Sequence, residues 1–351
     1  MKKRYCHEIE DWDLPKKNER SLFLGKIAET RHEAFLDVDE LTKHMIIAGS
    51  TGGGKTMTAQ VLVEEALQKG ISVIVIDPTA QWTGFIKPLK DEAIKKRYEL
   101  FKMDKRETRG WPTEIIKANL SEVNERWLQT NPGELKVFVT SHLKEKEIDV
   151  FITNMVNSIF KRTPLESQKL TTLLVFEEIH RILPRYGGQG IGLVALERAV
   201  REFRKWGIGV ILISQVLEDF VGEIRANIGT EFQLRTAYEE DLDKIKLKYG
   251  DPTVKAVIRE ETGTAMLHNS DYNIGKPFFV NIRPPYHDIS RLSEPELDKY
   301  EQLAKRISSI QSQASLKEDE LLNLELAKKE LLKGNFRLAE TYVEEISQRK
   351  S

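Results

Sequence analysis

The segment from Gly49 to Thr56 has the residue types and spacing of a loop that binds nucleotide phosphates. It reads Gly-Ser-Thr-Gly-Gly-Gly-Lys-Thr and matches the pattern GxxxxGK[ST]. Glycines let backbone N–H groups turn inward around phosphates, and the start of a following helix adds a positive dipole end. Lys55 can then reach the β- and γ-phosphates, and the Thr56 hydroxyl can ligate Mg²⁺. A glycine turn that binds no ligand is the alternative. We expect nucleotide contacts from Gly49, Ser50, Thr51, Gly52, Gly53, Gly54, Lys55, Thr56 and Met57.

Two adjacent carboxylates, Glu177 and Glu178, end the apolar run Thr172–Phe176. Successive side chains of an extended segment point to opposite sides, so the two acids can take different roles. Glu177 would hold Mg²⁺ through water, and Glu178 would act as the base or would position the attacking water. An acid pair here favours hydrolysis over phosphoryl transfer to a small molecule, because a water must be activated. The alternative is a solvated turn after a strand.

A polar side chain, Gln215, follows the apolar run Ile208–Ser214. Next to the strand that leads into the phosphate loop, such a side chain could touch the γ-phosphate and respond to its loss. The alternative is an ordinary hydrogen bond at a strand end.

Basic residues precede this run. Arg198, Arg201 and Lys205 lie close to one face at three- and four-residue spacing, with Arg204 beside Arg201. One of them could reach the nucleotide of a neighbouring subunit as an arginine finger. Arg235, after the next strand, is a further candidate for that role. The alternative is a basic stripe on the surface.

The order of predicted elements places these residues on a parallel α/β sheet. Strands are predicted at Met45–Ala48, Ile71–Ile76, Val137–Thr140, Thr172–Phe176, Ile208–Ser214, Glu231–Leu234, Thr264–Leu267 and Pro277–Ile282. Several are continuously apolar, as expected of strands buried on both faces. Helical spacing of apolar residues predicts helices at Lys55–Leu67 and Ile148–Lys161.

Three regions flank or interrupt this pattern. Residues 1–43 contain two short predicted strands, Leu22–Ile27 and Ala34–Val38, in a hairpin or barrel fragment. Within the predicted core, 44–290, cations outnumber acids over residues 84–135, which indicates a solvated insertion or, alternatively, a nucleic-acid patch. Residues 291–351 form a predicted helical appendage that opens on a capping box at Ser293–Glu296, with later helices at about 317–333 and 336–348.

Composition excludes several classes of protein. The chain has 351 residues, room for two or three domains of about 150 residues. Its 54 Lys and Arg and 55 Asp and Glu exclude a polybasic coat, so a nucleic-acid surface must be local or formed by assembly. The single cysteine, Cys6, excludes an internal disulfide framework and a cysteine-rich zinc site. No apolar run approaches the ~20 residues of a membrane span, and no secretory signal follows Met1–Arg4. We expect a soluble, cytoplasmic protein.

Taken in their order along the chain, the motifs resemble those of the HerA/FtsK superfamily, and more closely those of the HerA-type ATPases of archaea and bacteria. The likeness covers about residues 22 to 285. It is carried by His44–Thr56, Asp77-Pro78, Phe176–His180, Arg204–Gly207 leading to Ser214-Gln215, and Asn227–Thr230 before Arg235. The resemblance implies a RecA-like (ASCE) P-loop NTPase that uses ATP and Mg²⁺. It further implies a homo-hexameric ring that drives duplex DNA through its pore, with a NurA-like nuclease or a membrane machine as a possible partner.

Three features depart from the family pattern. The segment before the phosphate loop is shorter than the N-terminal barrel of HerA, which argues against docking a nuclease through it. The first acid is Glu177 where Asp is common, and the helices after Ser293 lie outside the pattern. On the resemblance as a whole, the leading hypothesis is a DNA-translocating ATPase. A motor for protein or nucleoprotein in a secretion, conjugation or packaging machine is the second hypothesis, and an ATP-gated scaffold without turnover is the third.

Overall fold

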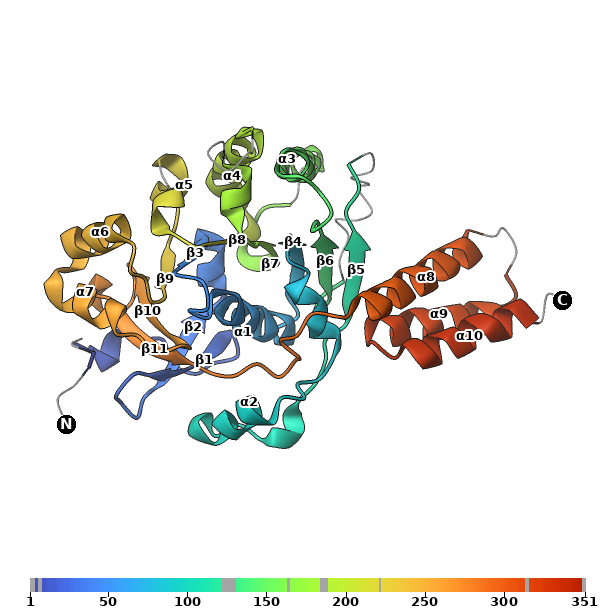
Figure 1. The fold of residues 1–351 in the computed structure, drawn as a ribbon, viewed down its shortest axis with the longest axis horizontal. Helices are drawn as coiled ribbons and strands as arrows, with labels where there is room; N and C mark the ends of the chain where they lie inside the picture. Colours follow the sequence, from blue (N-terminus) through green and yellow to red (C-terminus); the bar gives the residue numbers. More distant parts are fainter. Residues whose placement is uncertain are drawn as a thin grey trace.

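The computed structural model describes residues 4–5, 8–120, 131–162, 165–183, 189–220, 222–312 and 316–348; Cys6 and residues 121–130 lie outside them. Among these residues, one sheet has eleven strands in the order β2-β1-β11-β10-β9-β3-β8-β7-β4-β6-β5 (Figure 1). The strands are β1 (Ser21–Ile27), β2 (Glu33–Asp37), β3 (Met45–Ala48), β4 (Ser72–Asp77), β5 (Thr113–Lys117), β6 (Leu135–Val139), β7 (Ser167–Phe176), β8 (Trp206–Ser214), β9 (Thr230–Gln233), β10 (Thr264–Asn269) and β11 (Phe278–Ile282). The α-helices are α1 (Lys55–Gln68), α2 (Glu92–Lys96), α3 (Glu145–Lys161), α4 (Ile191–Glu202), α5 (Gly222–Ala226), α6 (Glu239–Tyr249), α7 (Asp251–Ile258), α8 (Glu294–Gln311), α9 (Glu318–Leu332) and α10 (Phe336–Gln348).

The strands from β9 to β5 in this order run parallel to one another. β10, β11 and the N-terminal strands continue the sheet in antiparallel fashion. The predicted mainly parallel sheet is therefore confirmed. β8 lies between β3 and β7, so the carboxyl ends of the strands that carry the predicted site residues meet at one edge.

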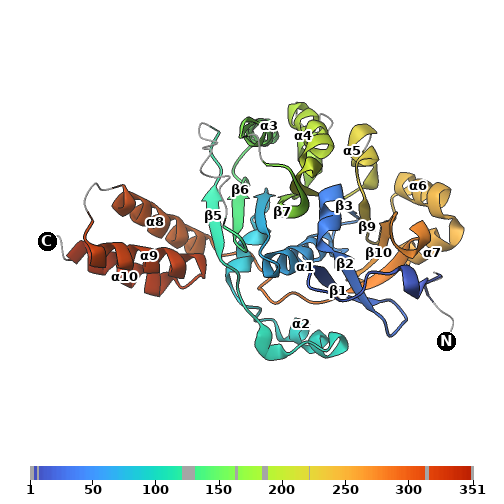
Figure 2. The same ribbon diagram turned by 180° about the vertical axis from the view of Figure 1, so that it is seen from behind.

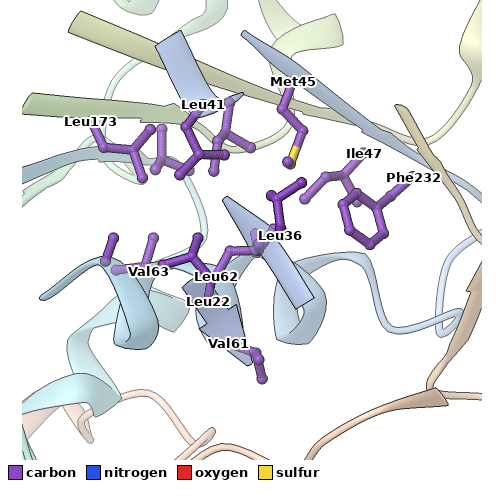
Figure 3. Packing of buried hydrophobic residues seen from close by; sticks show 14 of the residues in the cluster. Leu22, Leu36, Leu41, Met45, Ile47, Val61, Leu62, Val63, Leu173 and Phe232 are labelled. Atoms are coloured by element: carbon purple, nitrogen blue, oxygen red, sulfur yellow. The ribbon is translucent and has the colours of Figure 1, made fainter. Parts of the chain in front are cut away.

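Helices cover both faces of the parallel strands. α1 lies on one face, and α3, α4 and α5 lie on the other (Figures 1 and 2). Because neighbouring side chains of a strand point to opposite faces, Ile47 belongs to the apolar cluster that contains Leu62 of α1, whereas Ile46 belongs to the cluster of Phe151 and Leu196. Figure 3 shows the first of these two layers, in which leucines and valines of α1 contact the strands.

The N-terminal strands belong to the main sheet. β1 and β2 form the predicted antiparallel hairpin, and β1 then pairs with β11. The hairpin therefore extends the sheet on the side of β11.

The segment between β4 and β6 carries many charges but also has buried aromatic residues. Trp82, Tyr98 and Trp111 are buried, and β5 pairs with β6 at the end of the sheet. Aromatic side chains anchor this segment to the core, while cations such as Lys96 and Arg106 are exposed, as expected of a solvated surface.

The C-terminal helices pack on one another at the β5 end of the sheet (Figure 1). Ser293 and Glu296 form the predicted capping box of α8, and α9 and α10 match the later predicted helices. Tyr300 is buried, and its hydroxyl accepts a hydrogen bond from the Ile115 N–H of the edge strand at 3.0 Å. None of the helices in the described ranges combines the length and apolar composition that crossing a bilayer requires.

Candidate nucleotide-binding site

The backbone between β3 and α1 forms a tight loop because its glycines adopt conformations that other residues avoid. Gly54, the residue before α1, has φ +101°. A Cβ atom on Gly49 would lie 2.8 Å from the Cβ of Leu234, so a side chain there would collide with the chain after β9. The Ser50 N–H donates to the Arg235 carbonyl at 2.9 Å, and the Gly53 N–H donates to the Ser50 carbonyl at 3.0 Å. The loop is thereby closed on itself at the end of a buried strand.

Lys55 and Thr56 begin α1 at the sheet edge where the site residues gather. Lys55 is 6% exposed, and its Nζ donates to the Ser50 carbonyl at 3.3 Å. Burial lowers the pKa of Lys55, and the charges of Glu178 and Glu177 oppose that shift. The Thr56 hydroxyl donates to Oε1 of Glu177 at 2.8 Å. The structure thus brings the loop and the acid pair into contact.

Glu177 is a buried carboxylate with two hydrogen-bond donors among the described residues. Thr56 contacts one oxygen, and the indole N–H of Trp82 donates to the other at 3.0 Å. Burial raises the pKa of Glu177 to about 7, and the nearby charges of Asp77 and Glu178 add to the rise. A cation placed beside Glu177 would favour the ionised form of this carboxyl group.

Glu178 has a different environment from its neighbour. Its Oε2 lies 3.0 Å from Nδ1 of His180 and accepts a hydrogen bond from the Gln215 amide at 3.3 Å. Burial raises the pKa of Glu178, but the contacts with His180 and Gln215 and the attraction of Lys55 lower it overall below its usual value. Its φ of +51° is a left-handed conformation that costs free energy in a non-glycine residue. An ionised carboxylate is therefore held here at a strained position.

The candidate arginines lie at two different edges of the sheet. Arg235 follows β9 beside the phosphate loop, where its carbonyl contacts Ser50. Arg201 and Arg204 precede β8, which places them at the amino edge of the parallel strands. Arg201 pairs there with Glu223 at 2.6 Å, and Arg204 is exposed. Only Arg235 of these three lies near the loop of its own chain.

Three further side chains in the site were not assigned a role from the sequence. Asp77 ends β4 next to Glu177 and accepts hydrogen bonds from the backbone of Thr79 and Trp82. Asp77 and His180 stand within the quoted motifs, so their positions could have been suspected. Trp82 has no comparable signal, because its partner Glu177 lies 95 residues away.

Several solved structures are similar to this chain at low sequence identity. VirB4 of Thermoanaerobacter pseudethanolicus is 15% identical, with 76% of this chain and 97% of that chain covered and a TM-score of 0.49. The genome-packaging NTPase B204 of Sulfolobus turreted icosahedral virus 2, solved with ATP-gammaS, is 13% identical, with 70% and 98% covered and a TM-score of 0.42. EssC (ATPases 2 and 3) of Geobacillus thermodenitrificans is 12% identical, with 78% and 45% covered and a TM-score of 0.44.

No curated protein matches the chain significantly. The family described as the helicase HerA central domain matches residues 22–270, a stretch that contains the phosphate loop, the acid pair, Gln215 and the candidate arginines. With its mainly parallel sheet and its phosphate loop, this chain belongs to the HerA central-domain family of RecA-like P-loop ATPases.

Proposed function

We propose that this protein is a ring-forming, Mg-dependent ATPase that couples ATP hydrolysis to the translocation of duplex DNA. Hydrolysis is supported mainly by the ionised Glu178, which contacts Gln215 and lies close enough to Lys55 for their charges to interact. The family to which the chain belongs supports ATP as the nucleotide. The proposal places the protein in the cytoplasm, where ATP is available.

The proposed chemistry is an in-line attack of water on the γ-phosphorus. Glu178 accepts a proton from the water, a new P–O bond forms, and the bond between the γ-phosphorus and the β–γ bridging oxygen breaks to release ADP. Lys55 and the loop amides balance the charge of the phosphates, while Gln215 contacts both Glu178 and the γ-phosphate. Loss of the γ-phosphate would then free Gln215, which follows β8, the strand beside β3.

The donor set at Thr56 and Glu177 fits Mg²⁺. A hydroxyl and a carboxylate oxygen, 2.8 Å apart, are hard oxygen ligands, and two further carboxylates add negative charge. Thr56 would bind the ion directly, and Glu177 would bind it through water. When bound, Mg²⁺ neutralises charge on the β- and γ-phosphates.

A ring is supported by the position of the arginines. Arg201 and Arg204 lie at the edge of the sheet opposite their own phosphate loop, so either could meet a nucleotide only in another subunit. In a hexamer, one or two DNA-facing cations in each subunit would be repeated six times. This repetition would give salt-sensitive, sequence-independent binding despite a net charge of −1.

The direct test measures ATP hydrolysis with and without linear duplex DNA, together with electron-microscope images of the ATP-bound protein. Stimulation by DNA and ring-shaped particles are expected. An ATPase that forms rings and ignores DNA would favour protein or nucleoprotein as the cargo. A chain that stays monomeric under every nucleotide and DNA condition would overturn the motor interpretation.

A further inference from the structure

The phosphate loop has two sides with different chemistry. Glu178 and Gln215 lie on the side of β7 and β8, so the γ-phosphate of a hydrolysable nucleotide must face that way. A nucleotide is a linear molecule, and its α-phosphate and nucleoside must then extend away from these strands. That direction leads past the first turn of α1 toward the turn before β10, which contains Gly263.

Arg97 stands on this second side of the loop. A Cβ atom on Gly263 would lie 3.1 Å from Nη2 of Arg97 and 3.7 Å from Cε of Met57. Gly263 in turn packs against the loop, since a Cβ atom on Gly54 would lie 3.6 Å from the Gly263 nitrogen. Gly263 therefore lies between the Arg97 guanidinium and the backbone amides at the start of α1.

Arg97 differs from four other cations of the segment between β4 and β6. Lys87, Lys95, Lys105 and Arg106 each pair with a carboxylate. The side chain of Arg97 makes no ion pair, hydrogen bond or aromatic contact within the described residues, and the residue is only half-buried. An arginine beside an anion-binding loop, with no carboxylate of its own, is available to a phosphate.

The chain fixes Arg97 in this position. The next residue, Tyr98, is fully buried, and its hydroxyl donates to the Pro285 carbonyl at 2.5 Å. Phe101, one turn later, is also buried. A short helix (Arg97–Phe101) with two buried aromatic anchors therefore presents the arginine without leaving the backbone free to move away.

We propose that Arg97 binds the α-phosphate side of the nucleotide. This inference rests on the proposed ATPase function and assigns to part of the 84–135 segment a role in nucleotide affinity. The contact lies away from the reacting phosphate, so Arg97 holds ATP and ADP alike. It differs from Lys55, which serves the γ-phosphate side.

The test is isothermal titration of ATP and of ADP against wild type, Arg97→Ala, Arg97→Lys and the control Arg106→Ala. Arg106 is an exposed cation of the same segment that pairs with Asp104. We expect Arg97→Ala to weaken both nucleotides by the same factor, about tenfold or ~1.4 kcal/mol, with partial recovery in Arg97→Lys and no change in Arg106→Ala.

The outcomes separate this inference from the proposed function. Equal losses for ATP and ADP support it. A loss confined to ATP overturns it, because the contact would then be to the γ-phosphate. Wild-type affinity in Arg97→Ala, or an equal loss in Arg106→Ala, also overturns it while leaving the ATPase proposal intact. Absence of ATP binding by wild type overturns both proposals.

Discussion

Replacing Trp82 by Phe tests the role of Glu177 without removing a carboxylate. The indole N–H donates to a Glu177 oxygen at 3.0 Å, and both residues are buried. A hydrogen bond to an ionised group contributes about 1.5–3 kcal/mol. Loss of such a partner of a metal-binding group typically costs about 10- to 100-fold in metal affinity or activity. We expect the Mg²⁺ concentration that gives half-maximal ATP hydrolysis to rise about tenfold in Trp82→Phe.

The pH dependence of this variant gives a second measurement. Burial already raises the pKa of Glu177 to about 7, and the Trp82 hydrogen bond opposes that rise. Without the bond the pKa increases further, so more of the protein carries a protonated Glu177 near neutral pH. The deficit in ATP hydrolysis should therefore be largest below pH 7 and should shrink as the pH is raised.

Trp111→Phe is the matched control for Trp82→Phe. Trp111 is also buried, and its indole N–H donates to a buried carboxylate, Glu64, at 3.4 Å, but Glu64 lies away from the phosphate loop. Thermal denaturation should show a loss of stability in both variants. The same Mg²⁺ and pH dependence in both would refute a specific role for the bond from Trp82 to Glu177.

Three further outcomes follow from other parts of the structure. Arg283→Met leaves the buried Glu64 without its guanidinium partner at 2.9 Å, which should cost about 3–5 kcal/mol and lower the melting temperature by roughly 5 °C or more; an unchanged melting temperature would contradict this. Burial lowers the pKa of His44 from 6.5 to about 4, so as the pH falls this histidine is protonated in the unfolded chain before it is protonated in the folded one. The free energy of unfolding should thus fall by roughly 1.5 kcal/mol from this group between pH 6.5 and pH 5, and the stability measured by urea titration of His44→Gln should lack that part of the pH dependence. Mixing Arg204→Ala subunits with Lys55→Ala subunits should restore some ATP hydrolysis if Arg204 acts in trans, and absence of recovery would point to Arg201 or Arg235.

The phosphate loop and acid pair could be predicted because their signals are local. A strand, a glycine loop and a helix follow one another without interruption from Met45 to Gln68. Glu177 and Glu178 end a run that is apolar on both faces, so their place at the carboxyl edge follows from the parallel sheet. The pairing of Gln215 with Glu178 depended further on β8 lying beside β7, which the chain order alone does not specify.

The rest depended on long-range packing that no local pattern carries. The charges around residues 84–135 concealed the aromatic side chains, Tyr98 and Trp111 among them, that anchor this segment to the core. Short helices such as α7, which has eight residues, also span too few turns for apolar spacing to identify them. For the same reason, the sequence did not predict that Arg97 lies beside the phosphate loop. Its position next to Gly263 depends on the packing of two turns that are 166 positions apart in the sequence.

The most direct test of the central claim compares phosphate release from bound ATP in wild type and in Glu178→Gln during a single turnover. We expect the variant to bind ATP at close to wild-type affinity and to release phosphate about 100- to 10,000-fold more slowly, because the water loses its proton acceptor. Release at the wild-type rate would show that Glu178 does not activate the water, and would contradict the account.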